Sequence, residues 1–163
     1  EISYSMQQQN YCLGDVSCGT VILNEFGRLK VFNQLSLPCH RHYIEKKTIR
    51  KSPEQYKAGN DPTLLSAVKP GKSEAFSIAA TMVEISMLCS LEPIYCPDFM
   101  KFDQLKTILS ELKLLYSTFF VRILEDMLII DPEERACTGE IYALLKPYEQ
   151  AILEVKPFCP DRQ

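Results

Sequence analysis

The sequence lacks several features that would mark a well-known functional class. Its 163 residues carry a net charge of −3 with no basic stripe, so we expect neither nucleic acid nor an anionic lipid surface as the main partner. The six glycines contain no G-x-G-x-x-G spacing, which excludes a glycine-rich loop for nucleotide phosphates. We expect no membrane insertion, because Glu74 and Glu84 interrupt the most apolar stretch. The sequence also has no initiator methionine and no signal-peptide core, and we expect a processed or truncated chain.

Metal sites and disulfides are also weakly supported. Adjacent residues in Cys39-His40-Arg41-His42 cannot easily converge on one ion, and their spacing matches no common zinc pattern. We interpret this cluster as a polar loop and expect no metal or other cofactor. The seven cysteines are an odd number in no regular frame, which favours a reduced intracellular, cytoplasmic protein over a disulfide framework. They are Cys12, Cys18, Cys39, Cys89, Cys96, Cys137 and Cys159.

The most informative stretch that is present runs from Lys72 to Ser90. Its apolar residues cover most of a helical wheel, and a helix that is apolar nearly all round is buried in a larger domain. We expect Ser73 to cap this helix and Glu74 to lie in its first turn. The apolar set includes Phe76, Met82, Val83 and Ile85. The pattern therefore predicts a central helix surrounded by others.

The chain before this helix predicts mostly irregular structure. Residues 1–10 read as the end of a polar helix, and residues 11–19 as a loop containing two glycines. Short β-branched or apolar runs at 20–24 and 29–33 flank a turn at Gly27, which predicts one small β-hairpin.

The next part of the chain predicts two loops around one short helix. Residues 34–52 have no steady period, and long loops in compact domains are usually functional or mobile. Ser52 and Pro53 then fit the cap and first position of a helix. We interpret residues 59–71, which contain two prolines and two glycines, as a surface loop.

Three further helices follow the central one. Apolar residues recur at helical spacing over 99–115 and 118–130, and Pro132 prevents the second helix from continuing. A last helix from about Thr138 to Lys156 has a possible cap at its start. The fold class is therefore mainly α with one small β-hairpin, in a single domain.

Several short motifs, in this order, resemble the C-terminal lobe of a eukaryotic protein kinase. Leu13-Gly14-Asp15 stands in the place of the catalytic-loop H-R-D, and Thr20 in the place of the catalytic-loop Asn. Asn33-Gln34-Leu35 occupies the place of D-F-G, after a hairpin of the expected form. Ser52-Pro53-Glu54 resembles A-P-E at the end of the activation segment.

Two later motifs support the same resemblance. The start of the central helix, Lys72 to Ala79, is similar to K-S-D-x-(W/F)-S-x-G, with Glu74 in place of the Asp that ties down the catalytic-loop backbone. Ile130 to Arg135 resembles L-D-P-x-x-R, whose Arg pairs with the Glu of A-P-E in kinases. The resemblance thus implies a buried structural ion pair between Glu54 and Arg135.

The resemblance also implies an organisation for the whole chain, as one kinase C-lobe-like helical domain over 1–163 with the N-lobe absent. Residues 1–10 end a helix, 11–33 form a catalytic-loop-like segment and hairpin, and 34–54 form an activation-segment-like loop. Residues 72–163 make the helical core and a C-terminal tail.

The residues at the catalytic positions argue against phosphoryl transfer. A neutral amide at Asn33 and a hydroxyl at Thr20 replace the two magnesium ligands, although hard cations need carboxylates among several oxygen ligands. Ser17 stands where the family has a Lys near the transferred phosphate. Only Asp15 is retained, and an Asp in a loop is more often a turn former than a base. We therefore expect no catalytic residues, with Asp15, Thr20 and Asn33 as vestigial positions of a pseudokinase.

Three functional hypotheses remain open. The first is a structural or interaction module in a larger assembly, such as a cytoskeletal or ciliary one, whose protein partner covers an apolar upper face near Leu13, Val31 and Leu35. The leucine-rich helix at 105–115 is a second candidate docking face, although it reads equally well as core. The second hypothesis is a fragment of a divergent Ser/Thr kinase with Asp15 as base, and the third is an all-α domain of other ancestry.

Overall fold

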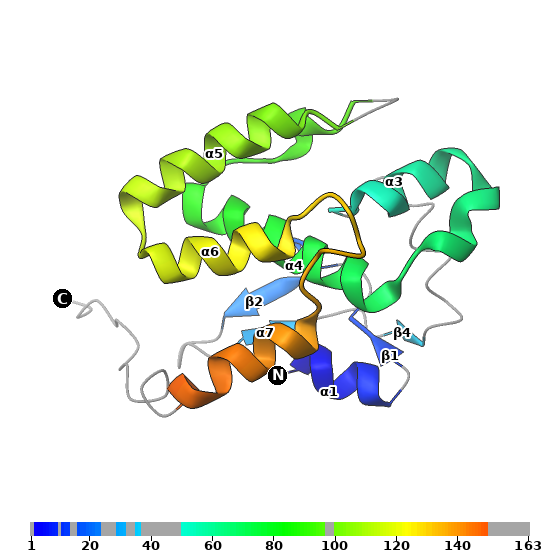
Figure 1. Ribbon diagram of the computed structural model, residues 1–163, viewed down its shortest axis with the longest axis horizontal. Helices are drawn as coiled ribbons and strands as arrows, with labels where there is room; N and C mark the ends of the chain where they lie inside the picture. The colour runs from blue at the N-terminus through cyan, green and yellow to red at the C-terminus, as the bar shows by residue number, and fades with distance from the viewer. Residues whose placement is uncertain are drawn as a thin grey trace.

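The protein is mainly helical and is built around one central helix. The computed structural model describes residues 2–9, 11–13, 16–23, 29–31, 35–36, 50–96 and 100–149. The central helix is α4 (Pro70–Met87), and in Figure 1 α5 and α6 lie above it while α1 and α7 lie below. The bounds of these four helices are Ile2–Gln8 for α1, Phe102–Leu115 for α5, Thr118–Met127 for α6 and Thr138–Leu145 for α7. The mainly-α prediction is confirmed.

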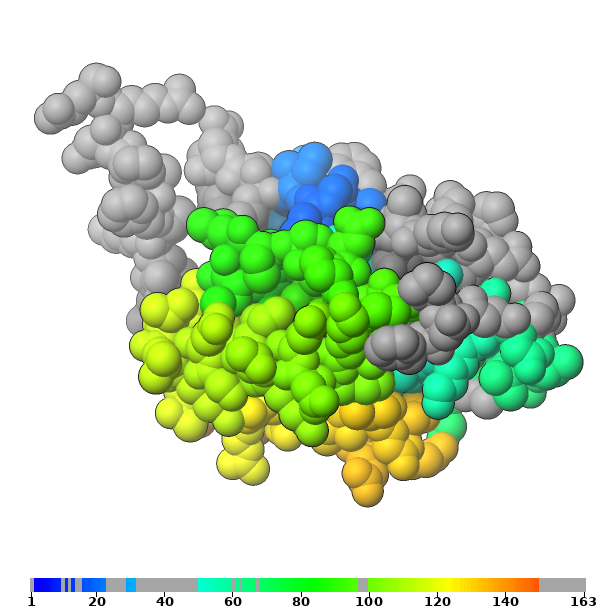
Figure 2. Space-filling view, turned by 90° about the horizontal axis from the view of Figure 1, so that it is seen from above, coloured from blue at the N-terminus to red at the C-terminus, as the bar shows by residue number. Residues whose placement is uncertain are grey.

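The hydrophobic core lies where α4 meets α5 and α6. Phe76 and Val83 of α4 are fully buried, and small side chains at Ala75, Ala79 and Ala80 allow the neighbouring helices to approach closely. α5 contributes three leucines to this core and α6 contributes four apolar side chains: Leu105, Leu109, Leu112, Val121, Ile123, Leu124 and Met127. In the view from above, α5 (yellow-green) covers much of the near face, and the N-terminal segments (blue) lie at one edge (Figure 2). The central helix is therefore packed against several neighbours as predicted, although Ile85 near its C-terminal end is exposed.

The ends of α4 differ from the prediction. The helix begins at Pro70 after the N-cap residue Lys69, so Ser73 lies inside the helix and does not cap it. Proline is well tolerated at this position, because the first helical N–H groups have no intrahelical partner. At the other end, Leu88 adopts the left-handed conformation with φ of 50°, which ends the helix before Ser90.

The predicted hairpin is present, together with a second strand pair. β2 (Val21–Leu23) pairs antiparallel with β3 (Leu29–Val31), with Val21 opposite Val31. β1 (Tyr11–Cys12) pairs antiparallel with β4 (Leu35–Ser36), and this pair was predicted as loop on both sides. Strands of two residues are too short to show an alternating pattern in the sequence.

The segment from Ser52 to α4 is more regular than predicted. α3 (Pro53–Asn60) begins as expected, with a capping box in which the Gln55 side chain accepts the Ser52 N–H at 3.0 Å. The predicted loop at 59–71 is wrong, because α3 extends to Asn60, a 3₁₀ helix η2 (Pro62–Ala67) follows, and α4 begins at Pro70. Pro62 and Pro70, which count toward the loop prediction, each stand at the first turn of a helix, where a missing N–H costs no intrahelical bond.

The C-terminal helices are present and are shorter than predicted. α5 starts at Phe102 and not at 99, and α6 ends at Met127 and not at 130. A 3₁₀ turn, η3 (Glu92–Ile94), precedes α5.

The last helix differs at both ends from the prediction. α7 is capped by Cys137, whose N–H donates to Glu140 Oε2 at 2.6 Å, and not by Thr138. A 3₁₀ turn, η4 (Lys146–Tyr148), follows it, and residues 150–156 of the predicted helix lie outside the described residues.

The N-terminal helix α1 packs beside α7, although the two are far apart in the sequence. The rings of Tyr4 and Tyr142 stack with their centroids 5.4 Å apart. The presence of α1 confirms the prediction that residues 1–10 contain helix. None of the described helices is both long and apolar enough to cross a membrane.

Candidate functional site

The residues predicted at the catalytic positions are only partly described. Asp15, Asn33 and Gln34 lie outside the described residues, as does the cluster from Cys39 to His42. Thr20 is described, and its hydroxyl accepts the Ser17 N–H at 3.0 Å and contacts the Ser17 carbonyl oxygen at 3.2 Å. This side chain therefore closes a local turn. Across the described ranges, no group of three or more His, Cys, Asp or Glu side chains could hold a metal ion.

The predicted ion pair between Glu54 and Arg135 is formed with bidentate geometry. Arg135 Nη1 lies 2.6 Å from Glu54 Oε1, and Nη2 lies 2.9 Å from Oε2. The Arg135 side chain is 0% exposed. Its remaining donors bind the carbonyl oxygens of Ile129, Ile130 and Lys72 at 2.7, 3.0 and 3.1 Å. One guanidinium thus holds α3, the start of α4 and the segment after α6 together.

The surroundings of Glu54 favour its charged form. Burial opposes the charge, but the hydrogen bonds and the positive charge of Arg135, with smaller help from Ser73, hold the pKa of Glu54 below its usual value. Ser73 Oγ donates to Glu54 Oε1 at 2.8 Å. The Phe76 ring packs under Arg135, whose guanidinium carbon lies 5.0 Å from the ring centroid.

Glu74 connects α4 to the N-terminal part of the chain. This buried carboxylate accepts from Ser3 Oγ at 2.5 Å and from Gln7 Nε2 at 3.4 Å, both on α1. It also forms a hydrogen bond with the backbone of Leu13. Burial raises the pKa of Glu74 above its usual value, and the three hydrogen bonds offset this only in part.

A row of polar side chains follows one face of α4, and we call it the α4 polar stripe. It consists of Ser73, Ser77, Thr81 and Glu84, all buried. Ser77 Oγ donates to the Arg50 carbonyl oxygen at 2.7 Å, and Thr81 Oγ1 donates to the Val16 carbonyl oxygen at 3.0 Å. The stripe therefore holds the backbone of two segments that are distant in sequence.

Glu84 completes the stripe at its C-terminal end. Its Oε1 lies 2.7 Å from Arg50 Nη2 and accepts the Leu91 N–H at 2.7 Å. The Cys18 thiol is within 3.7 Å of its other oxygen. Each residue of the α4 polar stripe thus forms a hydrogen bond or ion pair with a residue outside α4.

The sequence interpretation missed this stripe. We treated α4 as apolar all round, yet Ser73, Ser77, Thr81 and Glu84 recur at i, i+4, i+8 and i+11, which is the spacing of one helix face. Ile85 contradicts the all-round burial, because it is 48% exposed, and Met82 is only partly buried. Phe76 is fully buried as predicted.

The predicted partner surface also needs correction. Leu13 is only 4% exposed, so it is packed inside and is not part of an apolar upper face. Val31 is partly exposed, and nothing is described for the Leu35 side chain. Among the described hairpin residues, Ile22 and Leu29 carry exposed apolar side chains.

One face of the leucine-rich helix α5 belongs to the core. Leu105, Leu109 and Leu112 are buried, whereas Leu114 and Leu115 at its end are exposed. Its interpretation as core therefore holds for the first three leucines.

The three carboxylates Glu54, Glu74 and Glu84 each join separate parts of the chain. They accept hydrogen bonds from Arg135 Nη1, Ser3 Oγ and the Leu91 N–H respectively. No protein-family model matches the sequence, and no curated protein sequence matches it either.

Proposed function

We propose that the chain is a kinase C-lobe-like module without phosphotransfer activity, which serves as a structural and protein-interaction unit within a larger intracellular assembly. The observation that carries this proposal is the pair of contacts at the start of α4. Arg135 binds Glu54, and Glu74 binds the backbone of Leu13. Both contacts fit those that the resemblance to the kinase C-terminal lobe implies at these positions.

The residues at the metal positions support an inactive module. Asn33 brings no negative charge for magnesium, and the Thr20 hydroxyl is engaged in its own turn with Ser17. Phosphoryl transfer depends mainly on positioning the phosphates and neutralising their charge. Without the two usual metal ligands, the chain lacks the groups that would hold magnesium for this purpose. By contrast, the residues that join the segments of the fold are retained and bonded.

The exposed hairpin supports an interaction role. Ile22 and Leu29 present apolar side chains to solvent on a strand pair that has only three residues in each strand. A protein partner that packs on this hairpin would remove both side chains from water.

Nucleotide binding by the full-length protein tests the proposal. Binding of ATP is measured by calorimetry with and without magnesium, and phosphate transfer is measured with labelled ATP. We expect no magnesium-dependent binding and no transfer. The Asp15→Ala variant is the matched control, because it should behave as wild type. Magnesium-dependent ATP binding that is lost in Asp15→Ala would overturn the proposal in favour of a divergent kinase.

A further inference from the structure

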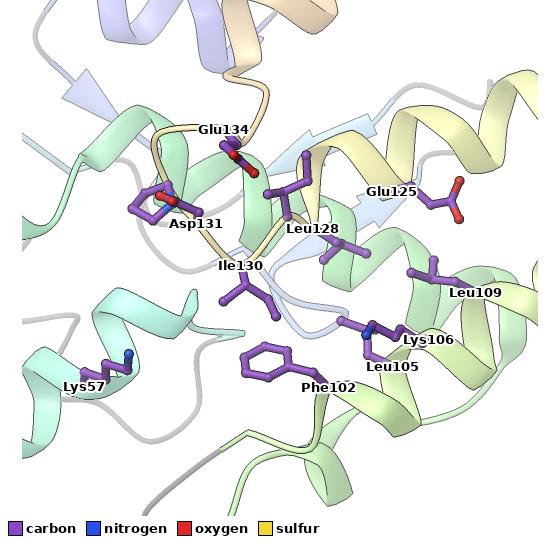
Figure 3. A pocket seen from close by; sticks show the side chains of 12 residues that line it. Lys57, Phe102, Leu105, Lys106, Leu109, Glu125, Leu128, Ile130, Asp131 and Glu134 are labelled. Carbon is purple, nitrogen blue, oxygen red and sulfur yellow. The ribbon is translucent and has the colours of Figure 1, made fainter.

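An open groove lies between α3, α5 and the segment that follows α6, far from the hairpin in the sequence. Its volume is about 620 Å³, and its floor is apolar, with Phe102, Leu105 and Leu109 on the α5 side and Leu128 and Ile130 opposite (Figure 3). Ile130 is 45% exposed although it stands at the centre of the groove. Apolar surface of this kind is a common feature of docking sites.

The α5 wall of the groove has a regular shape. Phe102, Leu105 and Leu109 follow the i, i+3, i+7 spacing of a single helix face. Two helical turns of this wall extend about 10 Å. Leu105 and Leu109 are buried and form the base of this wall, so Phe102 and the exposed Ile130 are the apolar side chains that an inserted residue would meet. The apolar face of a second helix, with side chains at similar spacing, fits a groove of this length.

The rim of the groove carries opposite charges on its two sides. Asp131 and Glu134 lie on one side of Ile130 in Figure 3, and Lys57 and Lys106 lie on the other. All four side chains are exposed, and within the described residues none of them takes part in an ion pair.

Neighbouring charges behave differently. Lys69 pairs with Glu133, and Lys113 pairs with Glu125 at 2.6 Å. Among the described ion pairs none uses the four rim charges, although Asp131 Oδ1 accepts the Glu133 N–H at 2.9 Å, so all four remain open to charged groups of a partner.

We propose that this groove binds an amphipathic helix of a partner protein. The helix inserts bulky apolar side chains against Phe102 and Ile130, places acidic residues beside Lys57 and Lys106, and places basic residues beside Asp131 and Glu134. Charge complementarity of this kind fixes the orientation of the bound helix. The groove is separate from the hairpin, so this inference stands or falls independently of the kinase resemblance.

Two synthetic peptides serve as probes of this groove. Both are about 14 residues long, or about 20 Å as a helix, with the same leucine anchors. The mixed peptide has glutamates along one flank and lysines along the other, and the basic peptide has lysines on both flanks. Binding to the full chain is measured by fluorescence anisotropy. We expect wild type to bind the mixed peptide about tenfold more tightly than the basic one.

Charge reversal should switch this preference. The double variant Lys57→Glu, Lys106→Glu has an entirely acidic rim, so it should prefer the basic peptide. All positions changed are exposed, and thermal melts check that the fold is retained. Ile130→Asp should weaken binding of both peptides by about tenfold or more. Leu114→Asp, which is also on α5 but outside the groove and 85% exposed, should leave binding unchanged.

The proposal is wrong if wild type binds neither peptide. It is also wrong if both peptides bind equally well to wild type, or if Ile130→Asp and Leu114→Asp have the same effect.

Discussion

At the scale of single residues, two buried glutamates respond to pH in opposite directions. The pKa of Glu54 is lowered, so its contribution to stability is present at neutral pH and is lost as the pH falls through the folded-state pKa. The pKa of Glu74 is raised, so its contribution is fully present below the ordinary value of 4.5 and is lost as the pH rises through the folded-state pKa. Neutral solution therefore favours the first contact and disfavours the second.

Replacing Glu74 by Gln tests this difference. The amide cannot ionise, so the variant should lack the loss of stability that the wild type shows between pH 4.5 and the raised pKa of Glu74. Relative to wild type, Glu74→Gln should become more stable as the pH rises across this range. Urea unfolding at a series of pH values measures the difference. A difference that is constant with pH would show that the carboxyl does not titrate abnormally.

The backbone conformation of Leu88 makes a prediction about stability possible. It is 92% exposed and has a φ of 50°, a conformation that costs non-glycine residues about 1–2 kcal/mol. We predict that Leu88→Gly raises the free energy of unfolding by about 0.5–1 kcal/mol, because glycine adopts this conformation freely. Leu114→Gly is the matched control, since Leu114 is exposed but helical, and it should lower stability. The same sign of change at both positions would contradict the argument.

At the scale of elements, α4 shows what an apolar pattern can and cannot predict. Its apolar density correctly predicted a central helix, because burial is the main reason for such a composition. The roles of Ser77 and Thr81 could not be predicted in this way. Both bind carbonyl oxygens of segments more than 25 residues away, at Arg50 and Val16, and periodicity contains no information about such partners.

Thr81→Val measures what the stripe contributes. Valine keeps the shape of threonine but leaves the buried Val16 carbonyl without its 3.0 Å donor, so we expect a loss of about 1–2 kcal/mol in unfolding free energy. Thr107→Val on α5 is the matched control, because Thr107 is exposed and only bonds back to Asp103 O at 3.0 Å. Its effect should stay within about 0.5 kcal/mol. Chemical unfolding of both variants compares the two, and equal losses would argue against a role for the stripe.

At the scale of the whole molecule, features marked by motifs were predictable and features made by tertiary contact were not. The hairpin has a glycine turn between two apolar runs, and the pair of Glu54 and Arg135 stands in two short motifs, so both were found in the sequence. The pairing of β1 with β4 was missed because it joins two-residue strands.

The burial of Leu13 and the groove around Ile130 were missed for a similar reason. The burial of Leu13 depends on its position beside Glu74 of α4, and the groove depends on how α3, α5 and the segment after α6 pack, so the local sequence gives no signal of either.

The ion pair between Glu54 and Arg135 gives the sharpest test of how the whole molecule is held together. These residues are 81 positions apart, and the guanidinium also binds three carbonyl oxygens. Glu54→Ala would leave a buried cation without its carboxylate. Arg135→Ala would leave three carbonyl oxygens without this donor and Glu54 with Ser73 as its described side-chain donor. We expect each change to lower the unfolding free energy by about 3–5 kcal/mol.

A matched exposed pair separates this effect from the general loss of a salt bridge. Glu133→Ala removes the surface contact with Lys69, which should change stability by no more than about 1 kcal/mol. Thermal melts of the three variants at neutral pH provide the comparison. A melting temperature of Glu54→Ala or Arg135→Ala equal to that of wild type would mean that α3, α4 and the segment after α6 are held together by apolar packing alone. The ion pair would then contribute nothing to holding these segments together, and the proposal of a kinase C-lobe-like module would lose its main support.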